Sequence, residues 1–336
     1  MQMIADTLHI SKNSVSQALT GKDGVSDDTR QLVIETAQRL GYRYSETRKK
    51  KQSERTSSIA LLASDFAFSQ RTFFGEIYLS IEQECSKRGM SLQILSINPQ
   101  ARDGLILPSF LQNQSVDGVL ILSHISTDYI NTVLATGIPT VLIDHHHPQI
   151  HADSILTNNR FGGYDAVSHL IGLGHTQIGF WGDVSFSPSY YERLEGYYMA
   201  MNEAGLAINS DWLVKDTVEE STYVMDRLSK MSSLPTAWFC VNDGLGFLLI
   251  SSLQQIGYKV PDDISVCSFD NGHLSRISTP TTTTMDVDLS KFGKIAMQQL
   301  IWRMNHPAEP YIEILLPTAL IVRESTKKRD QDHGIS

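Results

Sequence analysis

The sequence predicts an α/β protein that carries a small helical head at its N-terminus. From Ser58 onward, short runs rich in Ile, Val and Leu alternate with stretches of helical periodicity, and the alternation repeats along the chain. Near-continuous apolar runs are typical of strands buried on both faces of a parallel sheet. The residues before Ser58 instead contain three short amphipathic helical stretches. We therefore expect a three-helix head followed by a body of two doubly wound parallel sheets.

The head begins with helical spacing in residues 2–8. A second helix is expected over residues 12–19, because Ser11 is a good N-cap, and Ser26 is expected to cap a third. Their core-facing residues are expected to be Val15, Ala18 and Leu19 in the second helix, and Leu32, Val33, Ala37 and Leu40 in the third. Gly41 is expected to end the third helix.

The outer face of the second helix is polar, and its residues are Lys12, Asn13, Ser16, Gln17 and Thr20. Asn and Gln can pair bidentately with adenine, and Lys reaches guanine or phosphate. The pattern alone leaves two interpretations open. One is a helix-turn-helix that reads DNA, and the other is a helical dimerisation head whose polar residues meet water.

The body continues as strands and helices in turn. The strands are expected over 59–64, 92–97, 116–123, 138–144, 176–183, 236–243 and 264–270. The helices are expected over 76–89, 166–174, 193–205 and 244–257. We expect two similar α/β halves with a first boundary between Thr157 and Gly163. Two late apolar runs, YIEILLP and ALIVRES, are expected to return the chain between the halves.

The charge is distributed unevenly along the chain. The 336 residues are 41% hydrophobic and 19% charged, enough for two domains with large cores. The net charge of −9 argues at first against a nucleic-acid partner. However, residues 1–57 hold 10 basic and 7 acidic side chains, a net of +3, and the remaining 279 residues hold 18 and 30, a net of −12. The mean therefore conceals a basic head on an acidic body.

The cellular compartment is expected to be the cytoplasm. Cys85, Cys240 and Cys267 are an odd number of cysteines without CxxC spacing, which indicates free thiols in a reducing compartment. The N-terminus lacks the basic start and apolar run of a secretory signal. No stretch approaches the roughly 18 apolar residues of a membrane span, so we expect no membrane partner.

Residues 4–43, IADTLHISKNSVSQALTGKDGVSDDTRQLVIETAQRLGYR, resemble the DNA-binding head of the lactose-repressor (LacI/GalR) family. That family's run is close to I-A-x-x-A-G-V-S-x-x-T-V-S-R-x-L-N-G, then V-S-x-x-T-R and L-G-Y. Here Ser14, Gln17 and Thr20 replace the usual Thr, Arg and Asn. The resemblance implies that Lys12, Asn13, Ser16 and Gln17 enter the major groove. It also implies that phosphates are held by Ser14, Thr20, Ser26 and Thr29.

The segment after the head departs from that family. There, L-G-Y is followed by a hinge helix whose Leu wedges into the minor groove of the operator. Here the segment is YSETRKKKQSERTSS, with no apolar residue between Tyr44 and Ile59, and Lys51 aligns with that Leu. Two interpretations stay open: a lysine run that grips phosphates, or a solvated linker. In either case we expect less bending of the operator than a leucine wedge produces.

The resemblance extends over the body. GHTQIGFWGD, RLEGY, NDGLGF, VPDDISVCSFDN, STPTTTTMDVD and IVREST are similar to family landmarks. They imply a periplasmic-binding-protein-like body of two subdomains with an effector in the cleft between them. Strand ends are also where open α/β sheets bind ligands, and Ser64, Asp144, Asn242 and Asp270 are polar residues at expected strand ends.

The resemblance assigns roles to particular side chains in that cleft. Arg193, Asn242 and Asp270 would form a polar clamp, with Asp144 a weaker candidate. Phe73 and Phe74 would lie at the mouth, although the Asn-Pro that precedes them in the family is absent. Trp181, Tyr190 and Tyr191 are further candidates for stacking. Structural alternatives remain open: helix caps for Asn242 and Asp270, core packing for Phe73 and Phe74, and a surface ion pair of Arg193 with Glu192 or Glu195.

Enzymatic functions are poorly supported. His145, His146 and His147, with Asp144 and His151, invite a metal site, but no second ligand motif at zinc spacing accompanies them. The glycines of GLGHTQIG run from helix into strand, the reverse of a dinucleotide fingerprint. No nucleophile elbow of the form GxSxG is present. We therefore expect no catalysis, no cofactor and no metal.

These observations predict a homodimeric DNA-binding transcriptional regulator, expected to be a repressor, that binds a near-palindromic operator and a sugar or sugar derivative. Two alternatives remain: control by a protein co-effector that docks on the body, and a solute-binding protein with a weakly functional head. The expected domains are a helix-turn-helix at 1–43, a linker at 44–57, one subdomain at 58–157 with about 289–317, a second at 158–288 with about 318–326, and a disordered tail at 327–336.

Overall fold

The structure is a computed structural model that describes residues 1–20, 24–40, 57–65, 67, 73–123 and 125–329. It divides into two units, Met1–Thr56 and Ser57–Ser336, each of which is described by itself. The lysine run at 49–51 lies outside the described residues, as does most of the expected linker, so its two interpretations stay predictions. Within the described residues no helix is both long and apolar enough to cross a membrane.

The first unit contains three helices, α1 (Gln2–Leu8), α2 (Lys12–Thr20) and α3 (Asp27–Arg39). Their shared core is formed by Ile4, Ala5, Val15, Ala18, Val33 and Ala37. Both expected N-caps are confirmed: Ser11 Oγ accepts the N–H of Ser14 at 2.9 Å, and Ser26 Oγ accepts that of Thr29 at 3.3 Å. The caps satisfy backbone donors that a short helix leaves unpaired at its start.

Two expected core residues of α3 are exposed instead. Leu32 is 52% exposed and Leu40 is 37% exposed, so their placement in the core was wrong. The buried stripe of α3 consists of Val33, Thr36 and Ala37, which follow the spacing i, i+3, i+4. Leu32 precedes that stripe by one residue and so points about 100° away from it. Leu40 follows Arg39, the last residue of the helix.

The second unit begins with a six-stranded sheet that we call the sheet of lobe 1. Its strands are β1 (Ser58–Ser64), β2 (Ser91–Ile97), β3 (Gly118–Leu122), β4 (Thr140–Ile143), β5 (Asp153–Thr157) and β11 (Glu313–Leu316). They are all parallel, in the order β11-β5-β4-β3-β1-β2. The helices of lobe 1 are α6 (Phe74–Lys87), α7 (Pro99–Asp103), α8 (Ser109–Gln112), α9 (Thr127–Leu134) and α15 (Leu289–Asn305).

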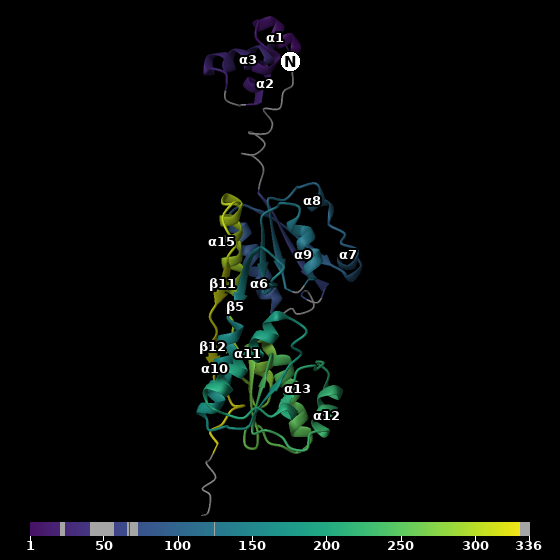
Figure 1. The fold of residues 1–336 in the computed structure, drawn as a ribbon, viewed down its shortest axis with the longest axis vertical. Coiled ribbons are helices and arrows are strands. Elements are labelled where there is room, and N and C mark those ends of the chain that lie inside the picture. Colours follow the sequence, from purple (N-terminus) through teal and green to yellow (C-terminus); the bar gives the residue numbers. More distant parts are fainter. Residues whose placement is uncertain (21–23, 41–56, 66, 68–72, 124, 330–336) are drawn as a thin grey trace, which may run out of the picture. The chain divides into compact units, whose positions relative to one another are not determined.

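Alternation along β1 shows how this sheet is buried. Ile59 and Leu61 pack in one hydrophobic cluster with side chains of α6 and α15, whereas Ala60 and Leu62 pack in a second cluster with side chains of α9. Successive side chains of a strand point to opposite faces, so both faces of the sheet are covered. Figure 1 shows α15 and α9 on opposite sides of the strands.

The sheet of lobe 2 repeats this architecture. Its strands are β6 (Ile178–Trp181), β7 (Leu213–Val214), β8 (Ala237–Cys240), β9 (Ser265–Asp270), β10 (Thr283–Asp286) and β12 (Ala319–Ile321). The order is β12-β10-β9-β8-β6-β7, and β12 alone is antiparallel to its neighbour β10. The helices are α10 (Asn159–Gly172), α11 (Pro188–Glu203), the 3-10 turn η1 (Ser210–Trp212), α12 (Ser221–Ser229), α13 (Asp243–Gln255) and α14 (His273–Ile277).

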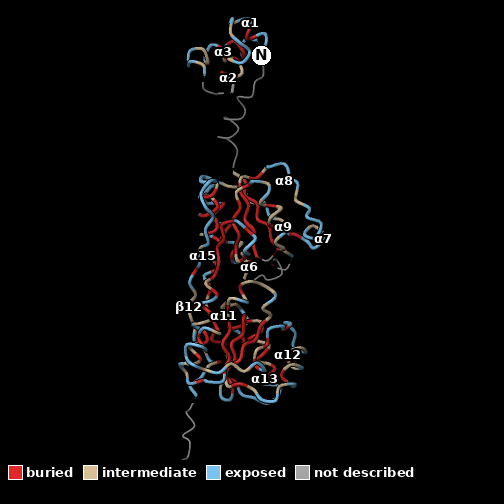
Figure 2. Tube along the Cα trace, viewed as in Figure 1, coloured by how far each residue is buried: buried red, intermediate tan, exposed pale blue. Residues whose placement is uncertain are grey.

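The chain passes between the lobes three times: between β5 and α10, between β10 and α15, and between β11 and β12. The two late apolar runs therefore lie in different sheets. Figure 2 shows the strands of both lobes as the buried centre of each and the helices as the half-exposed cover. The predicted α/β architecture of two doubly wound, parallel-rich sheets, which follow a helical head in the sequence, is confirmed.

Candidate ligand-binding cleft

A cavity of about 430 Å³ lies between the lobes, where strands of both sheets end. That volume is within the range of small-molecule sites. Six of the seven residues expected to bind an effector line it, and they are Phe73, Phe74, Asp144, Arg193, Asn242 and Asp270. The first three belong to lobe 1 and the others to lobe 2, so the cavity is built by both.

Ser64 is the expected residue that does not line the cavity in the described part of the chain. It ends β1, as anticipated, but its Oγ accepts the N–H of Ala67 at 3.2 Å. The hydroxyl thus accepts a hydrogen bond from a backbone N–H in the turn that follows the strand. A polar residue at a strand end can serve either the ligand or the next turn, and the sequence does not distinguish the two.

Arg193 of α11 is the buried centre of the cleft. It is only 2% exposed, and its Nη2 lies 3.1 Å from Asp270 Oδ1. Its Nε donates to Asn159 Oδ1 at 2.9 Å, its Nη1 donates to the carbonyl of Val241, and its guanidinium carbon lies 3.7 Å from the ring centroid of Phe269. The alternative of a surface ion pair with Glu192 or Glu195 is therefore wrong.

Asn242 caps a helix and also lines the cavity. It is the N-cap of α13, because its Oδ1 accepts the N–H of Leu245 at 2.8 Å. Its Nδ2 faces the cavity, where it donates to Tyr190 Oη at 2.7 Å and to the carboxylate of Glu219. Capping fixes the side chain rotamer, so the amide is held in place for the cleft.

The backbone around the cavity is strained. Among the described residues, seven that are not glycine have a positive φ, and four of these line the cavity: Ser123 (66°), Asp144 (56°), Asp270 (102°) and Asn271 (49°). Such conformations cost energy for side chains with a Cβ, although Asn and Asp tolerate them best. Strain of this kind concentrates at functional sites, where it aims side chains at a ligand.

The carboxylates of the cleft have raised pKa values. Burial raises the pKa of Asp144 to about 7; Arg193 opposes this effect and Asp270 adds to it. Burial also raises the pKa of Asp270, against the opposing charge of Arg193. The pKa of Asp243 rises to about 6 because of burial and the nearby Asp270, although Ser268 and Thr284 donate hydrogen bonds to it.

Aromatic rings form part of the wall. Phe73 and Phe74 meet edge to face with 4.9 Å between their centroids, and Tyr190 lies 5.5 Å from Phe186. Trp181 does not take part: it is fully buried and its indole N–H donates to Thr217 Oγ1 at 3.0 Å. The stacking role considered for Trp181 was therefore wrong. Tyr191 lies outside this cavity.

Sequence reasoning missed several lining residues, namely Glu76, Ser123, Phe186, Glu219, Asp243, Asn271 and Asp286. A signal existed for some of them. Asp243 and Asn271 directly follow predicted site residues, and Ser123 follows an apolar run. Glu219 lies in irregular chain between β7 and α12, where neither periodicity nor a motif marks it.

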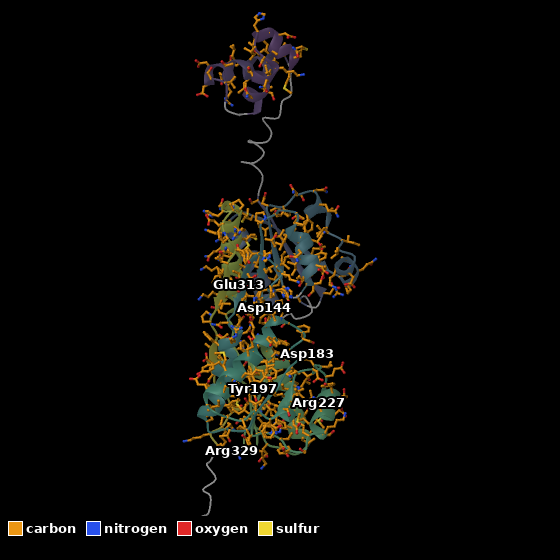
Figure 3. All side chains as sticks on the ribbon, in the orientation of Figure 1. Asp144, Asp183, Tyr197, Arg227, Glu313 and Arg329 are labelled. Atoms are coloured by element: carbon orange, nitrogen blue, oxygen red, sulfur yellow. The ribbon has the colours of Figure 1, made fainter. Side chains whose placement is uncertain are left out.

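Polar contacts join the two lobes beside the cavity. Ser189 Oγ of α11 donates to Asp144 Oδ1 at 3.3 Å, and Figure 3 shows Asp144 where the lobes meet. His146 lies 3.0 Å from Glu192 of α11 through Nε2 and 3.2 Å from Glu313 of β11 through Nδ1. No group of three metal-ligating side chains is found in the described residues. The histidine run instead contributes a bridge between the lobes.

The head presents the polar face expected of it. Lys12 and Asn13 are exposed at the start of α2, and Gln17 is half-buried one turn further on. Two of the expected phosphate contacts lie at helix N-termini: the hydroxyls of Ser14 and Thr29 are each 2.8 Å from those of the caps Ser11 and Ser26. Anions favour such termini. The side chain of Thr20 lies outside the described residues.

Comparison with known proteins shows the relationships of the chain. A family model described as a periplasmic binding protein-like domain matches residues 167–326. The ribose operon repressor of Haemophilus influenzae is 31% identical over 97% of this chain and 98% of its own. The transcriptional repressor PurR of Pasteurella multocida is 32% identical over the same shares.

Solved structures show the same fold. The complex of the transcriptional regulator CelR with cellobiose has a TM-score of 0.72 and 25% identity, over 96% of this chain and 98% of its own. A LacI family regulator from Enterococcus faecium with bound ribose has a TM-score of 0.69 and 25% identity, over 82% of this chain and all of its own.

A helix-turn-helix head joined to a two-lobed periplasmic-binding-protein-like body defines a class of ligand-responsive regulators. Within that class, the chain belongs to the LacI/GalR family of transcriptional regulators, which is not a family of enzymes.

Proposed function

We propose that this chain is a transcriptional repressor whose affinity for a near-palindromic operator is controlled by a small polar effector in the cleft, a sugar or sugar derivative. The observation that carries this proposal is the cavity between the lobes, where Asp144 of lobe 1 faces Arg193, Asn242 and Asp270 of lobe 2. A ligand that touches both lobes favours the lobe arrangement in which it makes the most contacts.

The lining of the cavity favours a small ligand over a protein co-effector. A protein that docks on the body needs an exposed surface, whereas these polar side chains converge inside a concave site. Carboxylate oxygens accept hydrogen bonds from hydroxyl groups, and aromatic edges and faces pack against the apolar faces of a sugar ring. The relatives whose structures contain ribose and cellobiose support the choice of a sugar.

The head supplies the contacts to DNA in this proposal. Lys12, Asn13, Ser16 and Gln17 enter the major groove and read bases. Ser14, Thr20, Ser26 and Thr29 hold phosphates and fix the register. A near-palindromic operator then requires two heads, one for each half-site. The proposed setting is the cytoplasm, where the operator is.

A homodimer would supply the two heads. Ile94 is 42% exposed on β2, the edge strand of lobe 1, and Leu79 is 54% exposed on α6, which packs beside β2. Exposed apolar side chains on an uncovered edge favour association with another chain. Analytical ultracentrifugation of Leu79→Lys/Ile94→Lys should show monomers where the parent chain shows dimers.

Simultaneous alanine substitution of Lys12, Asn13 and Gln17 tests whether the head binds DNA while the body binds the effector. All three side chains lie on the outer face of α2, so the fold of the head should be retained. We expect operator affinity to fall by at least tenfold while effector binding to the body is unchanged, measured by fluorescence anisotropy and calorimetry. Unchanged operator affinity in this variant would show that another face reads DNA.

A further inference from the structure

The cleft has an excess of acidic side chains. Six carboxylates line it, Glu76, Asp144, Glu219, Asp243, Asp270 and Asp286, and two guanidinium groups, Arg193 and Arg276. A cavity with this lining attracts cations and repels anions, because opposed charges in a partly desolvated space interact strongly. The question is which of these charges are free to act on a ligand.

Both arginines already have partners within the protein. Arg193 already uses Nε for Asn159, Nη1 for Val241 and Nη2 for Asp270. Arg276 is exposed at the rim and its Nη2 donates to the carbonyl of Asn271 at 2.9 Å. A carboxylate or phosphate on the ligand would have to displace the partners of the buried Arg193, whereas Arg276 at the rim stays partly open to it.

Some of the carboxylates are likewise occupied. Asp243 accepts from Ser268, Thr284 and the backbone of Gly272, and Asp286 accepts from Asn271 Nδ2 at 2.6 Å. These two acids hold the walls together and are not open to a ligand. The remaining acids are Glu76, Asp144, Asp270 and Glu219, and Glu219 accepts from Asn242 Nδ2 through Oε1.

Asp144 and Asp270 face each other from opposite lobes, and both are incompletely hydrogen-bonded. Asp144 receives a hydrogen bond from Ser189 at 3.3 Å, which is long for a hydroxyl donor. Asp270 Oδ1 is buried and 3.1 Å from Arg193 Nη2, but without the angles of a hydrogen bond. Glu219 extends this acidic side to the exposed rim.

We propose that the effector is a small polyol that carries a protonated amine, bound between Asp144 of lobe 1 and Asp270 of lobe 2 with Glu219 at the entrance. The inference rests on the proposed function, since it specifies the ligand of the same cleft. An ammonium group offers three donors to acidic acceptors, and the hydroxyls of the polyol serve the remaining polar groups.

Two further observations support an ammonium ligand. The pKa of Asp144 is raised to about 7 by burial and by the nearby charge of Asp270, so the charged form of this carboxyl is disfavoured unless a cation lies beside it. A bound ammonium would favour the charged form of Asp144. The rings of Phe73 and Tyr190 also line the cavity, and aromatic faces attract cations.

The charge arrangement also supplies a reason for lobe closure. When Asp144 and Asp270 are both ionised, these carboxylates on facing lobes repel each other, which opposes closure. A cation between them attracts both. The same ligand group that is recognised would therefore shift the lobe equilibrium on which control of the head depends.

The test compares matched ligands on the full chain by calorimetry at about pH 7. The pairs are glucosamine with glucose, galactosamine with galactose, mannosamine with mannose, and 2-amino-1,3-propanediol with glycerol, with glucuronate as the anionic probe. We expect at least one amine to bind roughly tenfold or more tightly than its neutral partner, and glucuronate not to bind. In Asp144→Asn the ratio of amine affinity to neutral-partner affinity should fall toward one. Asp128 is an exposed carboxylate on α9 outside the cavity, so the control Asp128→Asn should keep the ratio of the parent chain.

Neutral partners that bind as tightly as every amine, or no binding by any amine, would overturn the inference. The proposed function has a separate readout, the operator affinity measured with each sugar present. If a neutral sugar shifts operator affinity, the inference that the effector carries an amine is refuted, but the proposed function is not. Operator binding that responds to none of the sugars, neutral or charged, would refute both.

Discussion

Asp144 combines a strained backbone, a position between the lobes and a raised pKa. Its φ of 56° is accessible to Asp and Asn at little cost, so Asp144→Asn removes the charge without disturbing the chain. In the folded protein burial raises the pKa from 3.8 to about 7. Between these values the folded state holds a proton that the unfolded state has lost, so this carboxyl lowers stability progressively as the pH rises from about 4 to 7.

We therefore predict that Asp144→Asn stabilises the ligand-free protein at pH 8. Because the side chain is partly exposed, the expected gain is about 1–2 kcal/mol, and it should vanish near pH 4. Thermal unfolding followed by circular dichroism at several pH values measures it. Asp128→Asn is the matched control and should show no such pH dependence. A loss of stability at pH 8 would contradict the charge environment assigned to Asp144.

Single site residues could be predicted from sequence where a buried apolar run precedes them. Asp144, Asn242 and Asp270 each follow a buried apolar run, and that position could be recognised from sequence. Ser64 obeys the same rule but caps a turn. Glu219 reaches the cleft only through the path of an irregular segment, and tertiary structure alone places it there.

At the scale of elements, the close contact of α10 and α11 positions the centre of the cleft. A Cβ on Gly163 would lie 2.5 Å from the carbonyl oxygen of Arg193, and one on Gly196 would lie 2.2 Å from that of Arg160. The helices touch through their backbones at these glycines. This contact brings Asn159 of α10 to Arg193 of α11.

Gly196→Ala should force the two helices apart. Backbone atoms at 2.2 Å and 2.6 Å cannot yield as a flexible side chain would, so we expect a loss of roughly 2–3 kcal/mol and weaker effector binding. Gly172→Ala is the matched control in α10, because no atom lies within 4 Å of its added Cβ. It should be neutral or slightly stabilising in thermal unfolding. Equal effects of the two substitutions would argue against the close contact.

The His146 bridge links the lobes in a pH-dependent way. Its hydrogen bond to Glu192 is the main cause of its raised pKa, and Glu313 adds to it while burial opposes it. A histidine with a raised folded pKa contributes stability that is complete below its ordinary pKa of 6.5 and is lost as the pH rises through the folded value.

His146→Gln should therefore lower the Tm most at pH 6 and least at pH 9. The expected cost at pH 6 is about 0.5–1 kcal/mol, since the bridge is partly exposed. His147→Gln serves as the control, because the ring of His147 accepts the N–H of Gln149 and is exposed. A Tm difference that grows with pH would show that the bridge is not held by the imidazolium.

Elements with apolar runs could be predicted, and elements stabilised by buried polar groups could not. β5 has the sequence DSILT, and its Asp153 is fully buried against Arg303 of α15, at 2.7 Å between Oδ1 and Nη2. The local sequence does not predict an ion pair between residues 150 positions apart. Leu32 and Leu40 illustrate the reverse case, apolar residues that periodicity alone does not bury.

At the scale of the whole molecule, the charge of the chain is divided between a basic head of net +3 and a remainder of net −12. We propose that the acidic remainder repels DNA, which leaves the heads to select the binding site. The segment 44–58 contains no leucine wedge, so we predict a smaller operator bend than leucine-wedge relatives produce. A circular-permutation gel assay that shows a sharp central kink would contradict this expectation.

The central claim is that a ligand between the lobes controls binding of the head to DNA. The most direct measurement is the affinity for an operator selected from random duplex DNA, with and without the tightest-binding amine, for the parent chain and for Asp270→Asn. We predict a change of five- to 150-fold in the parent, the usual size of such coupling. We predict that Asp270→Asn binds operator but shows no response. An operator affinity that the bound ligand leaves unchanged in the parent chain would contradict the account.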